Sequence, residues 1–300
     1  MIFLEKVSKQ FDEITALRNV DLTIAQNTIF GLLGPNSAGK TTLIRIITSI
    51  FAPDNGKFFY NGKLVNNDFK PSIGYLPEER GLYKKMKVGE QLLYLAQLKG
   101  LSLKEAKLNL KYWLEKLSLT EREFQKVEQL SKGLQQKVQF IATVIHNPDI
   151  IILDEPFTGF DPINAQMIKN EIVELQKKGK TIIISSHRME SVEELCDEIA
   201  MLNKGEIILS GKIADIKKSY SKNTFLIKGI GEVVSLKSAE IHQKTTQENT
   251  TELKLKIKEN QTVNSMLQEL ISLDFQIQFV KEILPSMHDI FIENIKQNAK

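Results

Sequence analysis

The sequence has very little cysteine and no long apolar run. A single cysteine, Cys196, occurs among 300 residues, so no internal disulfide can form, as is typical of proteins in the reducing cytosol. The longest apolar runs, such as residues 150–153 and 182–184, are far shorter than the roughly 18 residues that a membrane-spanning helix needs. The N-terminus lacks the apolar segment of a secretory signal. We therefore expect a cytosolic protein without a membrane span of its own.

An excess of charge of one sign is also missing. The net charge of +3 is too small to indicate binding to nucleic acid, and we expect no such partner. The lysine-rich run at residues 84–87 is more typical of a solvated face than of a phosphate-binding patch. A chain with 42% hydrophobic and 26% charged residues is ordinary for a globular protein, and its length leaves room for two domains.

A glycine-rich segment at residues 34–41 reads G-P-N-S-A-G-K-T. It follows an apolar run at residues 29–33, which predicts a strand, and precedes residues 42–47, which look helical. Such a turn points backbone N–H groups and the positive end of the helix at one spot, which suits a polyphosphate. Lys40 would reach the β- and γ-phosphates, and the Thr41 hydroxyl would hold Mg²⁺. The predicted nucleotide-binding residues here are Gly34, Pro35, Asn36, Ser37, Ala38, Gly39, Lys40, Thr41 and Thr42.

A second apolar run, residues 150–153, ends in Asp154 and Glu155. Buried parallel strands are apolar throughout and deliver acids to the carboxyl edge of a sheet. We expect Asp154 to support the Mg²⁺ shell and Glu155 to lie beside the γ-phosphate. Taken alone, such a pair could equally be the solvated end of a strand.

Residues 130–136 read L-S-K-G-L-Q-Q and precede apolar residues at helical spacing. Ser131 and Gly133 therefore lie at a predicted helix N-terminus. Here the chain resembles the ATP-binding subunits of ABC transporters, whose signature begins Leu-Ser-x-Gly on such a helix. By itself, Ser131 would be an ordinary helix cap.

Three further segments extend this resemblance. Residues 158–162, T-G-F-D-P, are similar to the D-loop of the family, with Gly159 and Asp161, and His187 after the apolar residues 181–186 is similar to its switch histidine. Phe11 precedes the phosphate loop where the family stacks the adenine ring, although core packing is the commoner role of phenylalanine. Residues 73–83 occupy the place of the Q-loop, and their sequence resembles that of bacterial export ATPases of the sodium-efflux type.

The resemblance covers about residues 1–215 and implies an α/β fold. We expect a P-loop NTPase parallel-sheet core with an antiparallel β region, and a helical subdomain at about residues 84–147. Residues 1–218 would form the ABC-type ATP-binding domain, and residues 219–300 a small α+β C-terminal domain of unknown role. In the first, Ser102 and Glu105 predict a capping box ahead of a helix that carries Trp113 in its core face. In the second, strands are expected at residues 224–228, 251–258 and 275–283, helices at 263–273 and from Ser286, and a loop within the polar run 237–252.

The resemblance also implies a mechanism, with ATP and Mg²⁺ as the bound groups. Two cassettes would associate head to tail, so that the signature of one subunit closes over ATP held by the other. Glu155 would polarise the attacking water while His187 touches the γ-phosphate. The implied partners are a second ABC ATPase subunit, in a homo- or heterodimer, and an integral membrane permease subunit that docks near residues 78–87 and the helical subdomain. The protein would then be peripheral on the inner face of the cell membrane. The signature residues that would act in trans are Ser131, Lys132, Gly133 and Gln135.

Some positions depart from the family pattern. Glu78 stands where most members have glutamine, and because a carboxylate ligates Mg²⁺ well, we assign Thr41, Glu78 and Asp154 to the metal. Acids close to one another should raise at least one pKa. Ser37 replaces a common glycine, so the loop should use a φ that serine tolerates. Lys132 and Leu134 replace the glycine and glutamine of the fullest signature.

Other classes of ATPase share the phosphate loop and the signature but differ from this sequence in organisation. A ribosome-associated cassette protein would normally hold two cassettes in one chain, and a DNA-maintenance ATPase would insert a long coiled coil between Lys40 and Ser131. A regulatory module without turnover would not need Glu155. A non-transport ABC ATPase, regulatory or associated with nucleic acid or ribosomes, stays as the alternative. The sequence encodes neither the cargo nor the direction of transport.

Overall fold

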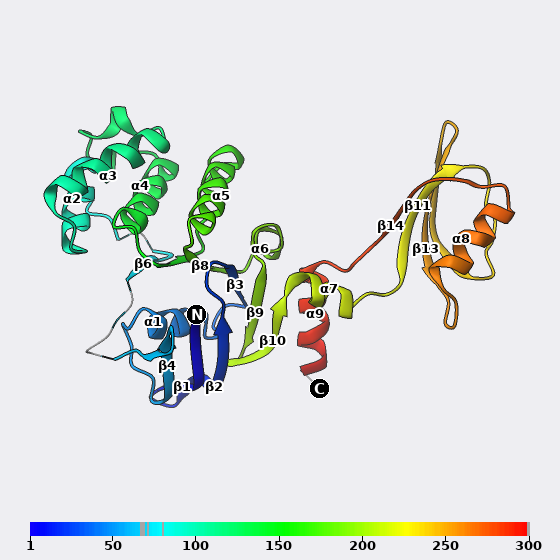
Figure 1. Ribbon diagram of the computed structural model, residues 1–300, viewed down its shortest axis with the longest axis horizontal. Helices are drawn as coiled ribbons and strands as arrows, with labels where there is room; N and C mark the ends of the chain where they lie inside the picture. The colour runs from blue at the N-terminus through cyan, green and yellow to red at the C-terminus, as the bar shows by residue number, and fades with distance from the viewer. Residues whose placement is uncertain (67–69, 71, 80, 299–300) are drawn as a thin grey trace. The chain divides into compact units, whose positions relative to one another are not determined.

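The computed structural model divides the chain into two compact units, Met1–Ile213 and Ala214–Lys300 (Figure 1). It describes residues 1–66, 70, 72–79 and 81–298, with side chains up to residue 295. No helix within these ranges is long and apolar enough to cross a bilayer. The two units are described in turn.

A six-stranded sheet forms the centre of the first unit, in the order β10-β9-β3-β8-β7-β6. Neighbouring strands are parallel except for β10, which runs antiparallel to β9. Every residue of β3, β7 and β8 is buried, which explains their unbroken apolar runs. The strands are β3 (Ile29–Leu33), β6 (Ile73–Leu76), β7 (Ile150–Asp154), β8 (Thr181–Ser186), β9 (Glu198–Asn203) and β10 (Glu206–Lys212).

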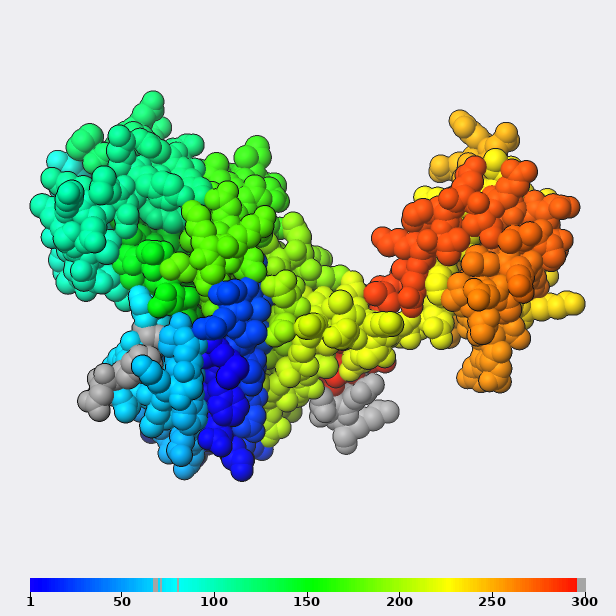
Figure 2. Space-filling model, viewed as in Figure 1, coloured from blue at the N-terminus to red at the C-terminus, as the bar shows by residue number. Residues whose placement is uncertain are grey.

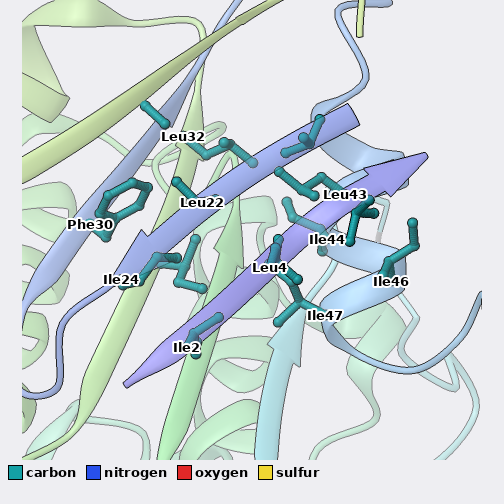
Figure 3. Close-up of a cluster of buried hydrophobic side chains, with 14 of the residues drawn as sticks. Ile2, Leu4, Leu22, Ile24, Phe30, Leu32, Leu43, Ile44, Ile46 and Ile47 are labelled. Atoms are coloured by element: carbon teal, nitrogen blue, oxygen red, sulfur yellow. The ribbon is translucent and has the colours of Figure 1, made fainter. Parts of the chain in front are cut away.

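An antiparallel sheet, in the order β2-β1-β4-β5, packs against this centre. Its strands are β1 (Ile2–Phe11), β2 (Ile14–Ile24), β4 (Asn55–Tyr60) and β5 (Lys63–Leu64). Figure 3 shows apolar side chains of β1, β2, β3 and helix α1 (Lys40–Ile47) gathered into one core. Because both β1 and β3 pack against α1, the start of this helix is fixed beside the end of β3.

Three helices make up the predicted helical subdomain, and they group together in Figures 1 and 2. They are α2 (Val88–Leu98), α3 (Leu103–Lys116) and α4 (Lys132–Val144), with short 3₁₀ turns at Thr120–Arg122 and Val127–Gln129. The capping box before α3 is confirmed, since Ser102 Oγ accepts from Glu105 N at 3.3 Å and Glu105 Oε2 accepts from Ser102 N at 3.0 Å. Trp113 is buried and meets Phe140 of α4 edge to face, with ring centroids 6.0 Å apart.

Four neighbouring strands of this sheet each end just before one of the predicted motifs: β6 before the Q-loop, β7 at the acid pair, β8 before the histidine and β3 before the phosphate loop. Leu76 pairs with Leu153, Asp154 with Ser185, and Leu33 with Ser186. Since parallel strands end at the same edge, the loops after β3, β6, β7 and β8 must meet there. The remaining helices of this unit are α5 (Pro162–Lys177) and α6 (Met189–Leu195).

The second unit is a four-stranded antiparallel sheet with its own core. The strand order is β12-β13-β11-β14, and buried side chains of the sheet pack with Met266 and Leu270 of helix α8. Its elements are α7 (Ile213–Ser219, which begins at the boundary), β11 (Thr224–Ile230), β12 (Ala239–Gln247), β13 (Thr250–Ile257), α8 (Val263–Ser272), β14 (Gln276–Glu282) and α9 (Met287–Asn298).

The polar run at residues 237–252 is mostly strand β12, paired antiparallel with β13, and the loop within it is the short turn at residues 248–249. β12 lies at the edge of the sheet, and most of its side chains are exposed. An exposed edge strand carries no apolar alternation, so backbone pairing with β13 holds it rather than a buried face.

Candidate active site

The loop between β3 and α1 is wound tightly around two glycines. Gly34 and Gly39 have φ values of 151° and 106°, and a Cβ at either position would lie 2.4 Å from Leu202 O or 2.6 Å from Ala16 O. Gly39 is the N-cap of α1 and provides no capping side chain. The N–H groups of the first helical turn therefore remain for an anion, and the helix dipole favours one there.

Ser37 lies in the middle of this loop with a φ of 62°. This is the left-handed region, which residues other than glycine visit at a cost. The loop therefore demands at this point a conformation that glycine adopts freely, and Ser37 adopts it while remaining exposed.

Lys40 folds back over the loop. Its Nζ donates to Gly34 O at 2.8 Å and to Pro35 O at 3.0 Å. Burial lowers the pKa of Lys40, while the carboxylates of Glu155, Asp154 and Glu78 act in the opposite direction. The ammonium group is thus held between the loop carbonyls and three acids, where a phosphate group could take the place of the carbonyl contacts.

Glu155 is the most constrained acid of the site. It is 8% exposed and has a φ of 49°, a strained conformation of the kind found at functional positions. Its Oε1 accepts from His187 N at 2.7 Å and lies 2.6 Å from His187 Nδ1, and its Oε2 accepts from Ser186 Oγ at 3.1 Å. The residues at the end of β8 therefore fix the carboxylate of Glu155, directly after β7.

Asp154 lies beside Glu155 and is 4% exposed. Burial raises the pKa of Asp154, and the neighbouring carboxylates Glu78 and Glu155 add to this rise. A divalent cation among these groups would remove both the desolvation cost and the repulsion.

These residues line one cavity of about 490 Å³. It brings together the phosphate loop with Glu78, Asp154, Glu155 and His187, which come from the ends of four neighbouring strands. It also includes residues of β2 that the sequence did not indicate. The lining residues are Ile14, Thr15, Ala16, Asn36, Ser37, Ala38, Gly39, Lys40, Thr41, Thr42, Glu78, Asp154, Glu155 and His187.

Phe11 lies next to this cavity but is not among its lining residues. Its ring is 39% exposed, meets Phe51 edge to face at 5.3 Å, and lies 5.5 Å from Lys9 Nζ. It pairs across the β1–β2 turn with Ile14, which does line the cavity. Phe51 and Lys9 therefore already contact the Phe11 ring on which adenine is expected to stack.

The signature residues lie elsewhere in the fold, at the start of α4. Ser131 is the N-cap, and its Oγ accepts from Leu134 N at 3.3 Å. Ser131 and Lys132 are exposed. Gln135 has a local contact, since its Nε2 donates to Val127 O and Leu130 O at 3.1 and 3.0 Å. None of these residues lines the described cavity of its own chain.

The D-loop residues shape the start of α5. Asp161 caps this helix by accepting from Asn164 N at 2.9 Å, and this bond lowers the pKa of Asp161. Gly159 turns the chain with a φ of 88°. A Cβ placed on Gly133 would lie 3.9 Å from the carbonyl oxygen of Gly159. The D-loop and signature are thus neighbours. Arg80, within the expected Q-loop and docking segment, lies outside the described residues.

Several residues that build the site carry no recognised motif in the sequence. Ser186 supports Glu155, and Thr15 and Ala16 line the cavity. A signal for Ser186 existed, because two serines end the otherwise apolar β8, where a buried hydroxyl needs a partner. No signal in β2 distinguishes Thr15 and Ala16 from other surface residues.

Comparison with known proteins identifies the family. The protein-family model described as "ABC transporter" matches residues 17–158. A second family model, "ATP-binding protein DrrA1-3-like, C-terminal domain", matches residues 211–295. An uncharacterized ABC transporter ATP-binding protein of Bacillus subtilis, YhaQ, is 43% identical over 98% of both chains. The chain belongs to the ATP-binding subunits of ABC transporters. The family expected from the motifs is confirmed.

Three other matches, from two proteins, bear on this ABC cassette. NatA, an ABC transporter ATP-binding protein of B. subtilis, is 37% identical and covers 73% of this chain and 92% of its own length. The bacterial ABC transporter cassette MJ0796, solved as a dimer, is 26% identical with a TM-score of 0.65, covering 71% of this chain and 99% of its own. A second structure of MJ0796 is a post-hydrolysis state with ADP and Pi, at 25% identity and a TM-score of 0.64. These cassette structures confirm the predicted α/β fold class.

Proposed function

We propose that this ABC subunit binds and hydrolyses MgATP within a head-to-tail pair of cassettes and powers export through a separate membrane subunit. The observation that carries the proposal is the single cavity in which the phosphate loop, Asp154, Glu155 and His187 converge. An anion-binding helix end and a buried, oriented carboxylate in the same cavity are what phosphoryl transfer to water requires.

The oxygen donors of the cavity fit Mg²⁺. Thr41 provides a hydroxyl, and Asp154 and Glu78 provide carboxylates, the ligand type that this hard cation prefers. Burial first, and then the carboxylates of Glu78 and Glu155, raise the pKa of Asp154, and a divalent cation would offset both causes. When bound, Mg²⁺ would neutralise charge on the β- and γ-phosphates.

The residues of this chain would then act by position and charge. Lys40 supplies a cation, and the first N–H groups of α1 hold the phosphates. Glu155 orients the attacking water and accepts its proton, while His187 and Ser186 hold the carboxylate in place. Such positioning needs no rearrangement of the site during the reaction.

The position of the signature supports a pair of cassettes. Ser131 and Lys132 are exposed at the start of α4 and do not line their own cavity. A second cassette, of this or another chain, would meet them with its bound nucleotide. A related cassette, MJ0796, has been solved as a dimer. ATP would close the pair, and hydrolysis would release it.

Exposed aromatic residues of the helical subdomain support docking to a membrane subunit. Tyr83 and Tyr94 are 54% and 44% exposed and contact each other edge to face, with ring centroids 6.4 Å apart. An exposed apolar cluster of this kind marks a partner surface. Attachment to a permease there would place the subunit on the cytoplasmic face of the membrane.

The test is purification of the tagged chain from detergent-solubilised membranes of the cells that naturally produce it, with identification of the membrane protein that co-purifies. We expect a stable complex whose ATPase activity responds to reconstitution in vesicles. Tyr83→Glu with Tyr94→Glu should abolish the complex and spare ATP binding, whereas Leu108→Glu, at an exposed residue of α3, should spare both. If the double variant still forms a complex, the docking assignment is wrong, and if no preparation hydrolyses MgATP, the enzymatic assignment is wrong.

A further inference from the structure

Helix α4, which begins at the signature, carries a buried glutamine that reaches the loop containing Glu78. Gln139 is 4% exposed. Its Nε2 donates to Pro77 O at 3.1 Å and lies 3.5 Å from Glu79 O. The amide therefore contacts the main chain on both sides of Glu78, while Glu78 itself lines the nucleotide cavity.

A second glutamine on the same side of α4 contacts the loop that follows Glu155. Gln136, also 4% exposed, lies three residues before Gln139, a spacing that places both on one face of the helix. Its Nε2 lies 3.5 Å from Pro156 O, directly after Glu155. The buried face of α4 thus touches the backbone next to both Glu78 and Glu155.

Close packing makes this a stiff connection. A Cβ at Gly74 would lie 2.2 Å from Thr143 O, so β6 and α4 are in direct backbone contact just before the loop begins. Gln139 Oε1 has no hydrogen-bond partner among the described residues. A buried unpaired oxygen is costly, and an apolar side chain would pack here at lower cost unless the amide N–H contact to the loop were needed.

We propose that Gln139 is a positioning residue that couples the two ATP sites of a cassette pair. It ties the Glu78 loop of a chain's own site to the helix whose first residues, Ser131 and Gly133, would meet the nucleotide of the partner. When α4 moves toward the partner's nucleotide, Pro77 follows through the amide contact, and Glu78 is set in its own cavity. This inference rests on the head-to-tail pairing proposed above.

The decisive variant is Gln139→Met, which keeps length and burial but removes the donor to Pro77. Thr143→Val is the matched control, because Thr143 is equally buried one turn further along α4. Its Oγ1 donates only within the helix, to Gln139 O at 2.9 Å. Thr143→Val removes a hydrogen bond within α4, whereas Gln139→Met removes the contacts to Pro77 O and Glu79 O and so releases the loop.

The readouts are the dependence of ATP hydrolysis on ATP concentration and the fluorescence of Trp113. Trp113 is the one tryptophan of the sequence and packs on Phe140, next to Gln139. For Gln139→Met we expect kcat to fall about 5- to 10-fold, equivalent to about 1–1.4 kcal/mol. The Hill coefficient should approach 1, and the affinity for MgATP measured by calorimetry should change less than about 2-fold, as expected for a lost positioning contact. Thr143→Val should keep the wild-type kcat, Hill coefficient and ATP-induced fluorescence change.

Wild-type kcat and cooperativity in Gln139→Met, or equal losses in both variants, would overturn the proposal. A double-mutant cycle provides a second measurement: in a Glu78→Ala background, Gln139→Met should change kcat less than about 2-fold, and additive losses would show that Gln139 does not act through Glu78. Failure of the pairing itself is distinguishable, because the wild-type chain would then neither dimerise on ATP nor show cooperative hydrolysis.

Discussion

Replacement of Glu155 by glutamine should separate ATP binding from hydrolysis in this ABC subunit. The change removes one negative charge and keeps the shape of the side chain. An amide oxygen at the Oε1 position can still accept from His187 N, and the amide nitrogen at the Oε2 position can donate to Ser186 Oγ. Ser186 Oγ has two lone pairs and uses one to accept from Arg188 N at 3.0 Å, so the other can accept from the new amide, while the Ser186 O–H loses Glu155 as its acceptor.

The expected loss follows from the role of the carboxylate. A positioned general base contributes about 10²- to 10⁴-fold to a rate, or about 3–5 kcal/mol of barrier. Binding should not suffer, because Glu155 is one of three carboxylates that oppose phosphate in the cavity. We therefore expect kcat for Glu155→Gln to fall at least 100-fold while MgATP affinity is equal or tighter.

The assay combines phosphate release, calorimetric titration with MgATP, and light scattering with and without ATP. The variant should become dimeric on ATP and remain so, since hydrolysis no longer opens the pair. Glu121→Gln, at an exposed carboxylate of a 3₁₀ turn, serves as the control and should match the wild type. Turnover above about a tenth of the wild-type rate would refute the role of Glu155 as base, and a monomer in saturating ATP would refute the paired cassette.

Three further predictions follow from the site and its surroundings. Lys40→Ala removes the cation of the loop, so MgATP affinity and hydrolysis should both collapse, and unchanged affinity by calorimetry would contradict the assignment. Glu78→Gln should keep or improve hydrolysis and shift the acid limb of the pH profile to lower pH, because it removes one of the charges that raise the pKa of Asp154; loss of hydrolysis with intact MgATP binding would instead assign Glu78 to catalysis. Burial lowers the pKa of His146, which follows α4, to about 4, whereas histidine in the unfolded chain titrates near 6.5. Between these two pH values the unfolded state binds more protons than the folded state. The free energy of unfolding should therefore fall by up to about 3 kcal/mol as the pH falls from 6.5 to 4. His146→Gln should flatten that fall in urea titrations, and an unchanged slope would show that other groups cause it.

The parts of the site that the sequence predicted are those in which chemistry and local structure coincide. Gly34 and Gly39 adopt backbone conformations that only glycine reaches easily, and they join a strand to a helix within a few residues. Asp154 and Glu155 end an apolar strand, and a buried strand can place acids only at its end. Such signals are contained in short segments, so no knowledge of distant contacts was needed.

The parts that the sequence did not predict depend on which side chain meets which across the fold. Phe11 follows the family spacing, yet its ring packs on Phe51 from the segment after α1. Gln135 reads as part of the signature, yet its amide holds the backbone of Val127 and Leu130. A pattern gives the position of a residue along the chain but not the partner that tertiary packing provides, and for long polar side chains that partner decides the role.

The same distinction explains how α4 can serve two sites. Its exposed first turn can be recognised from sequence, because a serine cap and a glycine before apolar residues at helical spacing have local causes. Its buried face cannot, because glutamine at a core position of a helix reads only as an exception to the apolar pattern. The hydrogen bond from Gln139 to Pro77 O explains that exception. The helix needs a polar side chain there because the loop after β6 lies outside the strand and its carbonyl oxygens need another donor. Buried glutamines such as Gln136 and Gln139 among the apolar residues of α4 are therefore the feature of this sequence that most directly marks the proposed connection between helix and loop.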